Sequence, residues 1–256
     1  MRVTCIQLEI GDRSKDDRLR DVLARLDDAH TSDLVLLPEL WPCGYFNFAS
    51  YADESEPIDG LTVQTLAAAA KRHQTWLFLG SFVERDGEGL YNTSLLIDDR
   101  GSVVARYRKM HLFGYQSREK ELLTRGEDVV VVETPWGKAG LAICYDLRFP
   151  ELFRDMLDRG AEFFLVTAAW PAARVDAWTV FCRARAMENI AYVFACNGAG
   201  TSGGVALAGH SLLVDPQGQI IAEGSDRADI VTDTVDIAFV AKVREVFPTV
   251  KERVLR

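Results

Sequence analysis

The sequence predicts an α/β fold, because short apolar runs typical of strands alternate with helical patterns along the whole chain. No Pro- or Ser-rich linker divides it, so we expect residues 1–256 to form one domain. A chain of 256 residues is long enough to bury a large core. Its 48% hydrophobic and 26% charged residues are those of an ordinary globular protein in water.

The N-terminal half begins with an alternating strand at Val3–Leu8, and Lys15–His30 places apolar residues at helical spacing. A short apolar strand at Leu34–Leu37 then runs into Pro38 and Glu39. An alanine-rich helix is predicted at Leu61–His73. Three strands separated by turn residues are expected after it, at Trp76–Val83, Tyr91–Ile97 and Val103–Arg108.

A long loop at Lys109–Asp128 separates the two halves. In the second half, helices are predicted at Phe149–Arg159, Asp176–Ile190 and Ile237–Val246. The turn at Asp215–Gly218 predicts a hairpin. Strands are predicted at Val129–Val132, in the run that ends at Ile143, and at Phe163–Val166, Tyr192–Cys196, Gly209–Val214, Gln219–Ala222 and Ile230–Val235.

Charge and cysteine content restrict the partners. A net charge of −9 and a pI near 5.0 argue against a nucleic-acid or anionic-membrane surface, so we expect a small-molecule or protein partner. Five cysteines without a CxxC pair suit a reduced, cytoplasmic setting and give no zinc spacing. Gln7 and Glu9 interrupt the N-terminal apolar stretch, and no apolar run reaches membrane-spanning length, so neither a signal peptide nor a membrane span is expected.

Cys144 is the leading candidate for a nucleophile. The apolar run Leu141–Ile143 carries its thiol into a polar turn, Tyr145–Arg148, and a helical pattern follows. A thiol at such a strand end is both rigid and accessible, and backbone N–H groups in the turn can bind developing negative charge. The alternative is a buried structural cysteine, since free cysteine often packs as a small hydrophobe.

Two more strand ends carry charged residues. Glu39 follows the strand at Leu34–Leu37, and Lys109 ends another strand just before His111. Carboxylates rarely lie beside buried strands without a partner. Glu39 could instead cap a helix or be solvated, and Lys109 could be a surface cation. We interpret His111 as a structural hydrogen-bonding residue more readily than as a base.

Taken together, three motifs identify a family. PEL around Glu39, RKMHLF around Lys109 and CYDLRFPEL around Cys144 resemble the nitrilase superfamily of carbon–nitrogen hydrolases, whose members share a Glu-Lys-Cys triad in this order. The resemblance covers nearly the whole chain. It implies an αββα sandwich, with two sheets packed face to face and helices outside. It also implies a homodimer or larger assembly, to which the tail at 247–256 could contribute.

The resemblance extends to further residues. The family carries a second glutamate after the lysine, which Glu119 matches better than Glu121. The stretches RARAMEN, at Arg183–Asn189, and GHS, at Gly209–Ser211, also look like family motifs. We interpret the charged residues of RARAMEN as structural ion pairs beneath the site, namely Arg183, Arg185 and Glu188.

These residues predict amide hydrolysis with no metal and no organic cofactor. Cys144 attacks the carbonyl carbon as a thiolate and forms a thioester, while Glu39 acts as the general base. Lys109 and the backbone N–H of Tyr145 stabilise the oxyanion. Glu119 orients the amide or Lys109.

The substrate is less defined by the sequence. CYDLRFPEL resembles the branch of omega-amidases and deaminated-glutathione amidases, which implies a small amide bearing a carboxylate, such as 2-oxoglutaramate. Arg148 and Arg174, the latter in a WPxxR-like segment that begins at Trp170, are candidates to bind this carboxylate. Arg148 could instead pair with Asp146 or Glu151, and Arg174 could be an ordinary helix-start residue.

Aromatic residues after the two charged strand ends are expected to wall the pocket or to pack in the core: Trp41, Tyr45, Phe46, Phe113 and Tyr115. Other substrates left open are a deaminated-glutathione-type amide, an N-carbamoyl compound, an aliphatic amide and a nitrile. A non-catalytic binding or scaffold protein of the same fold is the alternative of another class, and redox sensing by Cys144 is a further one.

Overall fold

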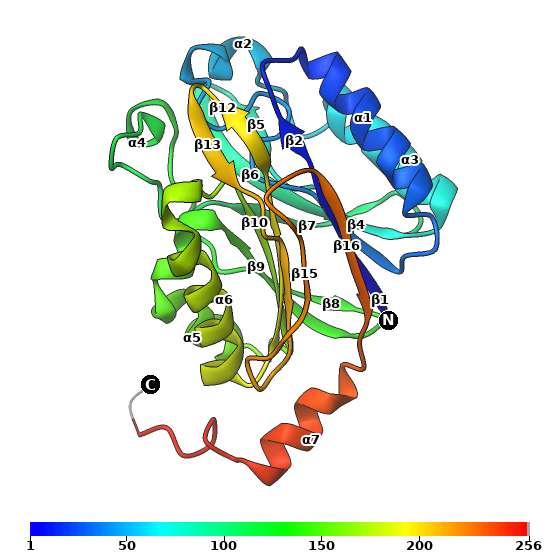
Figure 1. The fold of residues 1–256 in the computed structure, drawn as a ribbon, viewed down its shortest axis with the longest axis vertical. Helices are drawn as coiled ribbons and strands as arrows, with labels where there is room; N and C mark the ends of the chain where they lie inside the picture. Colours follow the sequence, from blue (N-terminus) through cyan, green and yellow to red (C-terminus); the bar gives the residue numbers. More distant parts are fainter. Residues whose placement is uncertain (255–256) are drawn as a thin grey trace.

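Two large β-sheets lie face to face between two layers of helices in the computed structural model, which describes residues 1–254 (Figure 1). Helices α1 and α3 cover the outer side of the first sheet, and α5 and α6 cover the second. This is the αββα sandwich that the resemblance implies, so the predicted fold is confirmed. In residues 1–254 no helix is long and apolar enough to cross a lipid bilayer.

The first sheet has seven strands in the order β16-β1-β3-β4-β6-β5, with β7 also paired to β6. Strands β1, β3 and β4 run parallel, and the remaining pairs are antiparallel. The bounds of its strands are β1 Arg2–Gln7, β3 Leu34–Leu36, β4 Trp76–Phe78, β5 Phe82–Asp86, β6 Gly89–Ile97, β7 Val103–Arg108 and β16 Asp229–Thr234.

The second sheet has six strands in the order β15-β14-β11-β10-β9-β8. Its central strands β9, β10 and β11 are parallel, so their carboxyl ends lie side by side. The bounds are β8 Val131–Thr134, β9 Gly137–Ile143, β10 Phe163–Ala168, β11 Tyr192–Asn197, β14 Leu212–Val214 and β15 Ile220–Glu223. The predicted hairpin turn at Asp215–Gly218 joins β14 and β15, as expected.

Seven helices complete the described chain over residues 1–254. Ser14 caps α1 by accepting a hydrogen bond from the Asp17 N–H, and Pro150 opens α5 at the position where its missing N–H costs nothing. The predicted long helices are confirmed to within two residues at each end. The bounds are α1 Lys15–Asp28, α2 Tyr51–Glu54, α3 Leu61–His73, α4 Glu119–Leu122, α5 Pro150–Asp158, α6 Val175–Asn189 and α7 Ala238–Val246.

Several local features differ from the prediction. The short helices α2 and α4 were not expected, and the strand expected at Gly209–Val214 begins only at Leu212. The strand expected at Trp76–Val83 is broken at Gly80, whose φ is +76° and whose backbone lies so close to Pro38 that a Cβ would stand 2.1 Å from the Pro38 carbonyl oxygen. A small third sheet was also not expected. It contains β2 Glu9–Ile10, β12 Ala199–Ser202 and β13 Val205–Ala208, runs of two to four residues that are too short to give a clear strand signal.

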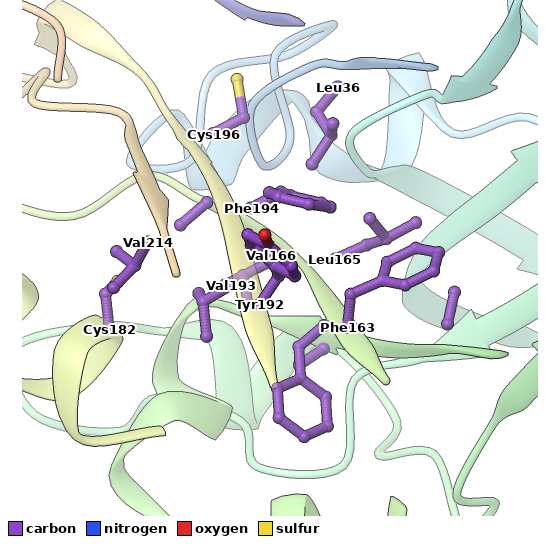
Figure 2. Packing of buried hydrophobic residues seen from close by; sticks show 14 of the residues in the cluster. Leu36, Phe163, Leu165, Val166, Cys182, Tyr192, Val193, Phe194, Cys196 and Val214 are labelled. Carbon is purple, nitrogen blue, oxygen red and sulfur yellow. The ribbon is translucent and has the colours of Figure 1, made fainter. Parts of the chain in front are cut away.

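The core lies between the sheets and under the helices. Leu36 of the first sheet belongs to one buried cluster with Leu165 and Phe194 of the second (Figure 2). A second cluster joins α1 and α3 to the outer face of the first sheet, for example through Leu26 and Leu66. Burial of apolar surface on both faces of each sheet therefore fixes how the two sheets are placed relative to one another.

The carboxyl ends of β3 and β10 meet, although about 130 residues separate them. The Thr167 hydroxyl donates to the Leu37 carbonyl oxygen at 2.8 Å, and the Glu39 N–H donates to the Ala168 carbonyl oxygen at 3.2 Å. These bonds bring the segments that follow β3 and β10 into contact. The candidate catalytic residues lie at this junction of the two sheets.

Candidate active site

Cys144 begins a short 3₁₀ turn, Cys144–Arg148, directly after β9. Its φ is +48°, in the left-handed region that a non-glycine residue rarely adopts, so the turn is held by its surroundings. The residue is 9% exposed and lines a narrow cavity. A strained, nearly buried thiol at the edge of a cavity is more consistent with a functional role than with a structural cysteine.

Glu39 is buried at the end of the first sheet and touches the second. Its Oε1 accepts hydrogen bonds from Lys109 Nζ and Asn92 Nδ2, both at 2.8 Å. Its Oε2 accepts from the Ala169 N–H at 3.0 Å. This carboxylate neighbours the Cys144 thiol, whose pKa is raised by the burial of the thiol and by the charge of the carboxylate. The structure thus places an acceptor beside the thiol.

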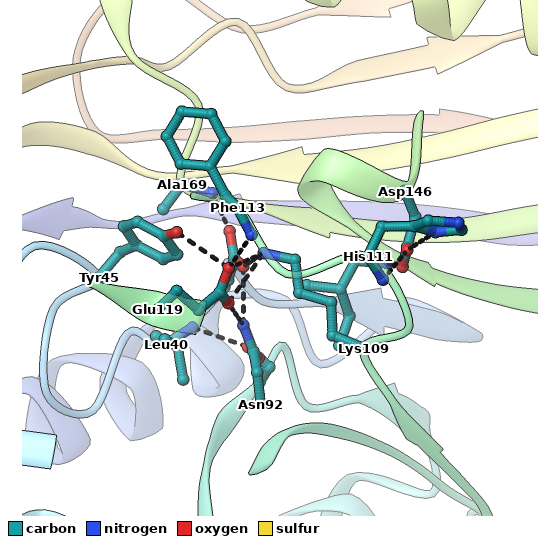
Figure 3. A network of polar contacts seen from close by, with 12 residues as sticks. Leu40, Tyr45, Asn92, Lys109, His111, Phe113, Glu119, Asp146 and Ala169 are labelled. Atoms are coloured by element: carbon teal, nitrogen blue, oxygen red, sulfur yellow. Dashed lines mark hydrogen bonds and ion pairs between the residues drawn. The ribbon is translucent and has the colours of Figure 1, made fainter. Parts of the chain in front are cut away.

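Lys109 is fully buried between two carboxylates (Figure 3). Its Nζ lies 2.8 Å from Glu39 Oε1 and 3.0 Å from both carboxylate oxygens of Glu119. Glu119 Oε2 also accepts from the Tyr45 hydroxyl at 3.1 Å and from the Phe113 N–H at 2.6 Å. Every charged group here has hydrogen-bond partners, as burial requires. Glu121, by contrast, is exposed and pairs with Arg118.

Asn92 is a further residue of the site, and the sequence gives no sign of it. Its Nδ2 donates to Glu39 Oε1 at 2.8 Å and to Glu119 Oε1 at 2.9 Å, so one amide group links the two carboxylates. The backbone carbonyl of Asn92 also accepts from the Lys109 N–H at 2.9 Å. Asn92 lies inside β6, where the neighbouring residues are typical of any strand, and no local sequence pattern distinguishes it.

Burial and charge set the proton affinities. Burial raises the pKa of Glu39, and the charge of Glu119 raises it further, while Lys109 opposes both. Burial and the neighbouring Glu39 raise the pKa of the Cys144 thiol well above its usual value. Burial alone would lower the pKa of Lys109, but Glu119 and Glu39 together raise it above its usual value. The resting site therefore holds a thiol, a lysine cation and a carboxylate with increased basicity.

A narrow cavity of about 20 Å³ opens beside Cys144 and is walled mainly by aromatic side chains. That volume holds little more than one water molecule, so the cavity is narrow at this point. The expected residues Tyr45, Phe46, Phe113, Tyr145, Arg148, Trp170 and Arg174 all line it. Trp41 and Tyr115 do not line it. Trp41 is fully buried in the core, with its Nε1 donating to the Leu79 carbonyl oxygen, whereas Tyr115 is 59% exposed.

Two arginines face this cavity without a carboxylate partner among residues 1–254. The guanidinium of Arg148 lies 5.2 Å from the Trp170 ring centroid, and that of Arg174 lies 4.9 Å from the Tyr115 ring centroid. Within residues 1–254 neither is within ion-pairing distance of an acidic side chain, so the ion pairs considered for Arg148 are not formed. Aromatic faces hold such cations while leaving their N–H groups free for an anion.

The stretch RARAMEN, at Arg183–Asn189, contacts the turn Cys144–Arg148 that carries the proposed nucleophile. Arg185 Nε and Nη2 donate to the Leu147 carbonyl oxygen, at 3.0 and 2.7 Å, and Nη1 pairs with Glu188 at 2.7 Å. Arg183 is not part of this pair, since it donates instead to the Gly218 carbonyl oxygen. The structural interpretation thus holds for Arg185 and Glu188.

No group of three or more metal-binding side chains occurs within the described part of the chain.

Comparison with known proteins identifies the family. The sequence model of the carbon–nitrogen hydrolase family matches residues 2–245 of this chain. The chain belongs to the carbon–nitrogen hydrolase family, in the omega-amidase-like branch of the nitrilase superfamily, and is an amidase.

Two curated relatives and one solved structure illustrate this. The chain is 36% identical to a 2-oxoglutaramate amidase of Bacillus subtilis, over 96% of this chain and 95% of the relative. It is 34% identical to a 2-oxoglutaramate amidase of Paenarthrobacter nicotinovorans, over 92% and 84%. A carbon–nitrogen hydrolase superfamily protein of Xanthomonas campestris, solved with an arsenic adduct in its active site, superposes with a TM-score of 0.93 at 30% identity, covering 100% of this chain and 98% of that one.

Proposed function

We propose that the protein hydrolyses the ω-amide of a small dicarboxylic acid, with 2-oxoglutaramate as the best candidate, to the acid and ammonia. The observation that carries this proposal is a thiol beside a buried Glu-Lys-Glu network, in a cavity that also presents two unpaired guanidinium groups. The similarity to two 2-oxoglutaramate amidases supports the choice of substrate.

In the acylation step, Cys144 Sγ attacks the amide carbon while Glu39 takes the thiol proton. The resulting oxyanion is stabilised by Lys109 and by the N–H of Tyr145. Neutral Glu39 attracts Lys109 Nζ less strongly, which frees an N–H of the lysine for this oxyanion. Glu39 then gives the proton to the amide nitrogen, the C–N bond breaks, ammonia leaves, and a thioester remains on Cys144.

In the deacylation step, Glu39 takes a proton from water, whose oxygen attacks the thioester carbon. The same donors stabilise the second oxyanion. When this intermediate collapses, the C–S bond breaks and the proton on Glu39 returns to the sulfur. The products are the carboxylic acid and the starting thiol. Glu119 takes no proton in this scheme; it holds Lys109 in place and keeps the lysine charged.

The pH dependence follows from the raised pKa of Glu39. Ionised Glu39 is needed to accept the thiol proton, so kcat/KM should fall as the pH drops through a value above the ordinary glutamate range. Glu119→Gln removes a charge that raises the Glu39 pKa, and should move this acid limb to lower pH. The measurement is kcat/KM against pH for both proteins; a limb that the substitution leaves in place would contradict the assignment.

The substrate test measures ammonia release from 2-oxoglutaramate, 2-oxosuccinamate, glutamine, a neutral aliphatic amide, an N-carbamoyl amino acid and a nitrile. We expect turnover of the 2-oxo acid amides. Arg174→Met should raise KM for 2-oxoglutaramate by about 100-fold, the loss expected for a two-pronged charged contact, and leave the neutral amide unaffected. Arg148→Met is the matched variant that tests the other guanidinium. Preference for the neutral amide or the N-carbamoyl compound would contradict the proposed carboxylate contact.

We further propose that the protein is a homodimer or larger homo-oligomer working in the cytoplasm. Exposed apolar side chains on α6 and near the C-terminus, at Val180, Met187, Phe247 and Val254, support the assembly, because such surface is often covered by a second subunit. All five cysteines are free thiols, which suits a reducing compartment.

A further inference from the structure

A buried carboxylate outside the proposed triad faces the nucleophile turn. Asp146, two residues after Cys144, is fully buried and accepts four hydrogen bonds. Its Oδ2 accepts from the Ile143 N–H at 2.9 Å and the Tyr107 hydroxyl at 2.7 Å. Its Oδ1 accepts from the His111 N–H at 3.1 Å and His111 Nδ1 at 2.7 Å. Figure 3 shows Asp146 and His111 on the far side of Lys109 from Glu119.

The partners of Asp146 flank two reactive groups of the site. Ile143 directly precedes Cys144, whereas Tyr107 and His111 lie two residues before and two residues after Lys109. The Tyr107 hydroxyl also accepts a hydrogen bond from the Met110 N–H at 3.3 Å. One carboxylate therefore ties the strand that delivers the thiol to the backbone on both sides of the lysine.

The two side-chain donors, Tyr107 and His111, are held in position to donate to this carboxylate. Burial, together with the charge of Asp146, raises the pKa of Tyr107 well above its usual value, so the phenol keeps its proton and donates it. The His111 ring stacks on Phe149 with centroids 3.8 Å apart and an interplanar angle of 7°. This stacking aims Nδ1 at Asp146, and the contact with a carboxylate oxygen requires a proton on that nitrogen.

The turn at Cys144 needs such support, because its positive φ costs free energy that neighbouring contacts must offset. We propose that Asp146 is a positioning residue for the hydrolytic reaction, and that its bonds to His111 and Tyr107 hold Cys144 Sγ in register with Lys109 and Glu39. This inference rests on the proposed function of Cys144 as the nucleophile. His111 then acts through Asp146 and not as a proton carrier.

A pair of substitutions at His111 tests this inference. In His111→Asn the side-chain amide nitrogen can occupy the place of Nδ1 and donate to Asp146, whereas His111→Ala removes the donor. We expect His111→Ala to lower kcat by about 100-fold, the effect of a small misplacement of a reacting group, with KM changed less than about threefold. His111→Asn should recover most of this loss. Equal kcat values for the two variants would overturn the proposal.

Asp146→Asn provides a second readout that does not depend on the substrate. Its amide cannot accept from all four donors, so the turn should shift and Cys144 should react more slowly with iodoacetamide, by about tenfold or more, in protein that is still folded by circular dichroism. Cys144→Ala gives the background from other thiols. If only the melting temperature falls, with alkylation rate and kcat unchanged, Asp146 is merely structural and the proposal is wrong. Alkylation forms a C–S bond by displacing iodide and cleaves no amide bond, so this result is separate from any failure of the proposed amidase function.

Discussion

Cys144→Ala should abolish ammonia release from 2-oxoglutaramate, by a factor of at least about 10⁴, because no other group at the site can form the thioester. The fold should remain, since the substitution removes one sulfur atom beside an existing cavity and alanine meets the same backbone strain at φ +48°. Cys144→Ser should be nearly as inactive, because a hydroxyl is far harder to ionise than a thiol.

Cys182→Ala is the matched control for this experiment. Cys182 is also a buried free cysteine, but it lies on α6 under the second sheet, away from the cavity. Its substitution should leave kcat within a fewfold of the original. Mass spectrometry of wild-type protein quenched during turnover should find the acyl group on the peptide that contains Cys144. Ammonia release by either Cys144 variant would refute the nucleophile assignment.

Lys109→Met should both inactivate and destabilise the protein. It removes the cation that lies 2.8 Å from Glu39 and 3.0 Å from Glu119, so two buried carboxylates are left without their shared partner. Breaking a buried charge pair in this way costs about 3–5 kcal/mol of unfolding free energy. Activity should fall at least about 10³-fold, because the oxyanion loses its charged donor. Thermal unfolding and ammonia release measure the two effects.

The pH dependence and a compensated variant separate these two effects. In Lys109→Met the folded-state pKa of Glu39 should lie even further above its unfolded value, so stability is retained at low pH and lost as the pH rises. Adding Glu39→Gln and Glu119→Gln removes the uncompensated charges and should restore stability without activity. A fully active Lys109→Met protein would exclude the lysine from the mechanism.

The fold and the proposed triad could be predicted from the sequence because their signals are local. Glu39 and Cys144 each follow an apolar strand, and a charged or reactive residue at such a place differs visibly from its neighbours. Lys109 instead follows a strand that contains Arg106 and Arg108, and only the resemblance of RKMHLF to a family motif distinguished it. The alternation of strands and helices indicated the fold class for the same reason. The break at Gly80 could not be foreseen, since it depends on contact with the backbone of Pro38, far away in the sequence.

The sequence did not predict the residues that act through hydrogen bonds between distant parts of the chain. Asn92 has the sequence context of any strand residue, and its role depends on Glu39 and Glu119 arriving from other elements. Asp146 was considered only as a partner for Arg148, whereas its actual donors include Tyr107 and His111 from the first half of the chain. Such partnerships arise from how the sheets pack, which a single sequence does not encode in any short pattern.

The proposed catalytic residues and the residues that can select a substrate lie on different parts of the fold, because Glu39 lies where the ends of β3 and β10 meet. Glu39 follows β3 of the first sheet and is hydrogen-bonded to the backbone of Ala168 and Ala169 at the end of β10 in the second, so its place is fixed by the packing of the two sheets. The side chains that can contact the rest of an amide, such as Phe46, Phe113 and Arg174, lie instead on surface segments between elements. Substitutions in those segments can therefore change the substrate specificity while the proposed catalytic residues keep their positions. A mutant library aimed at new amides should diversify these segments and leave the strand ends alone.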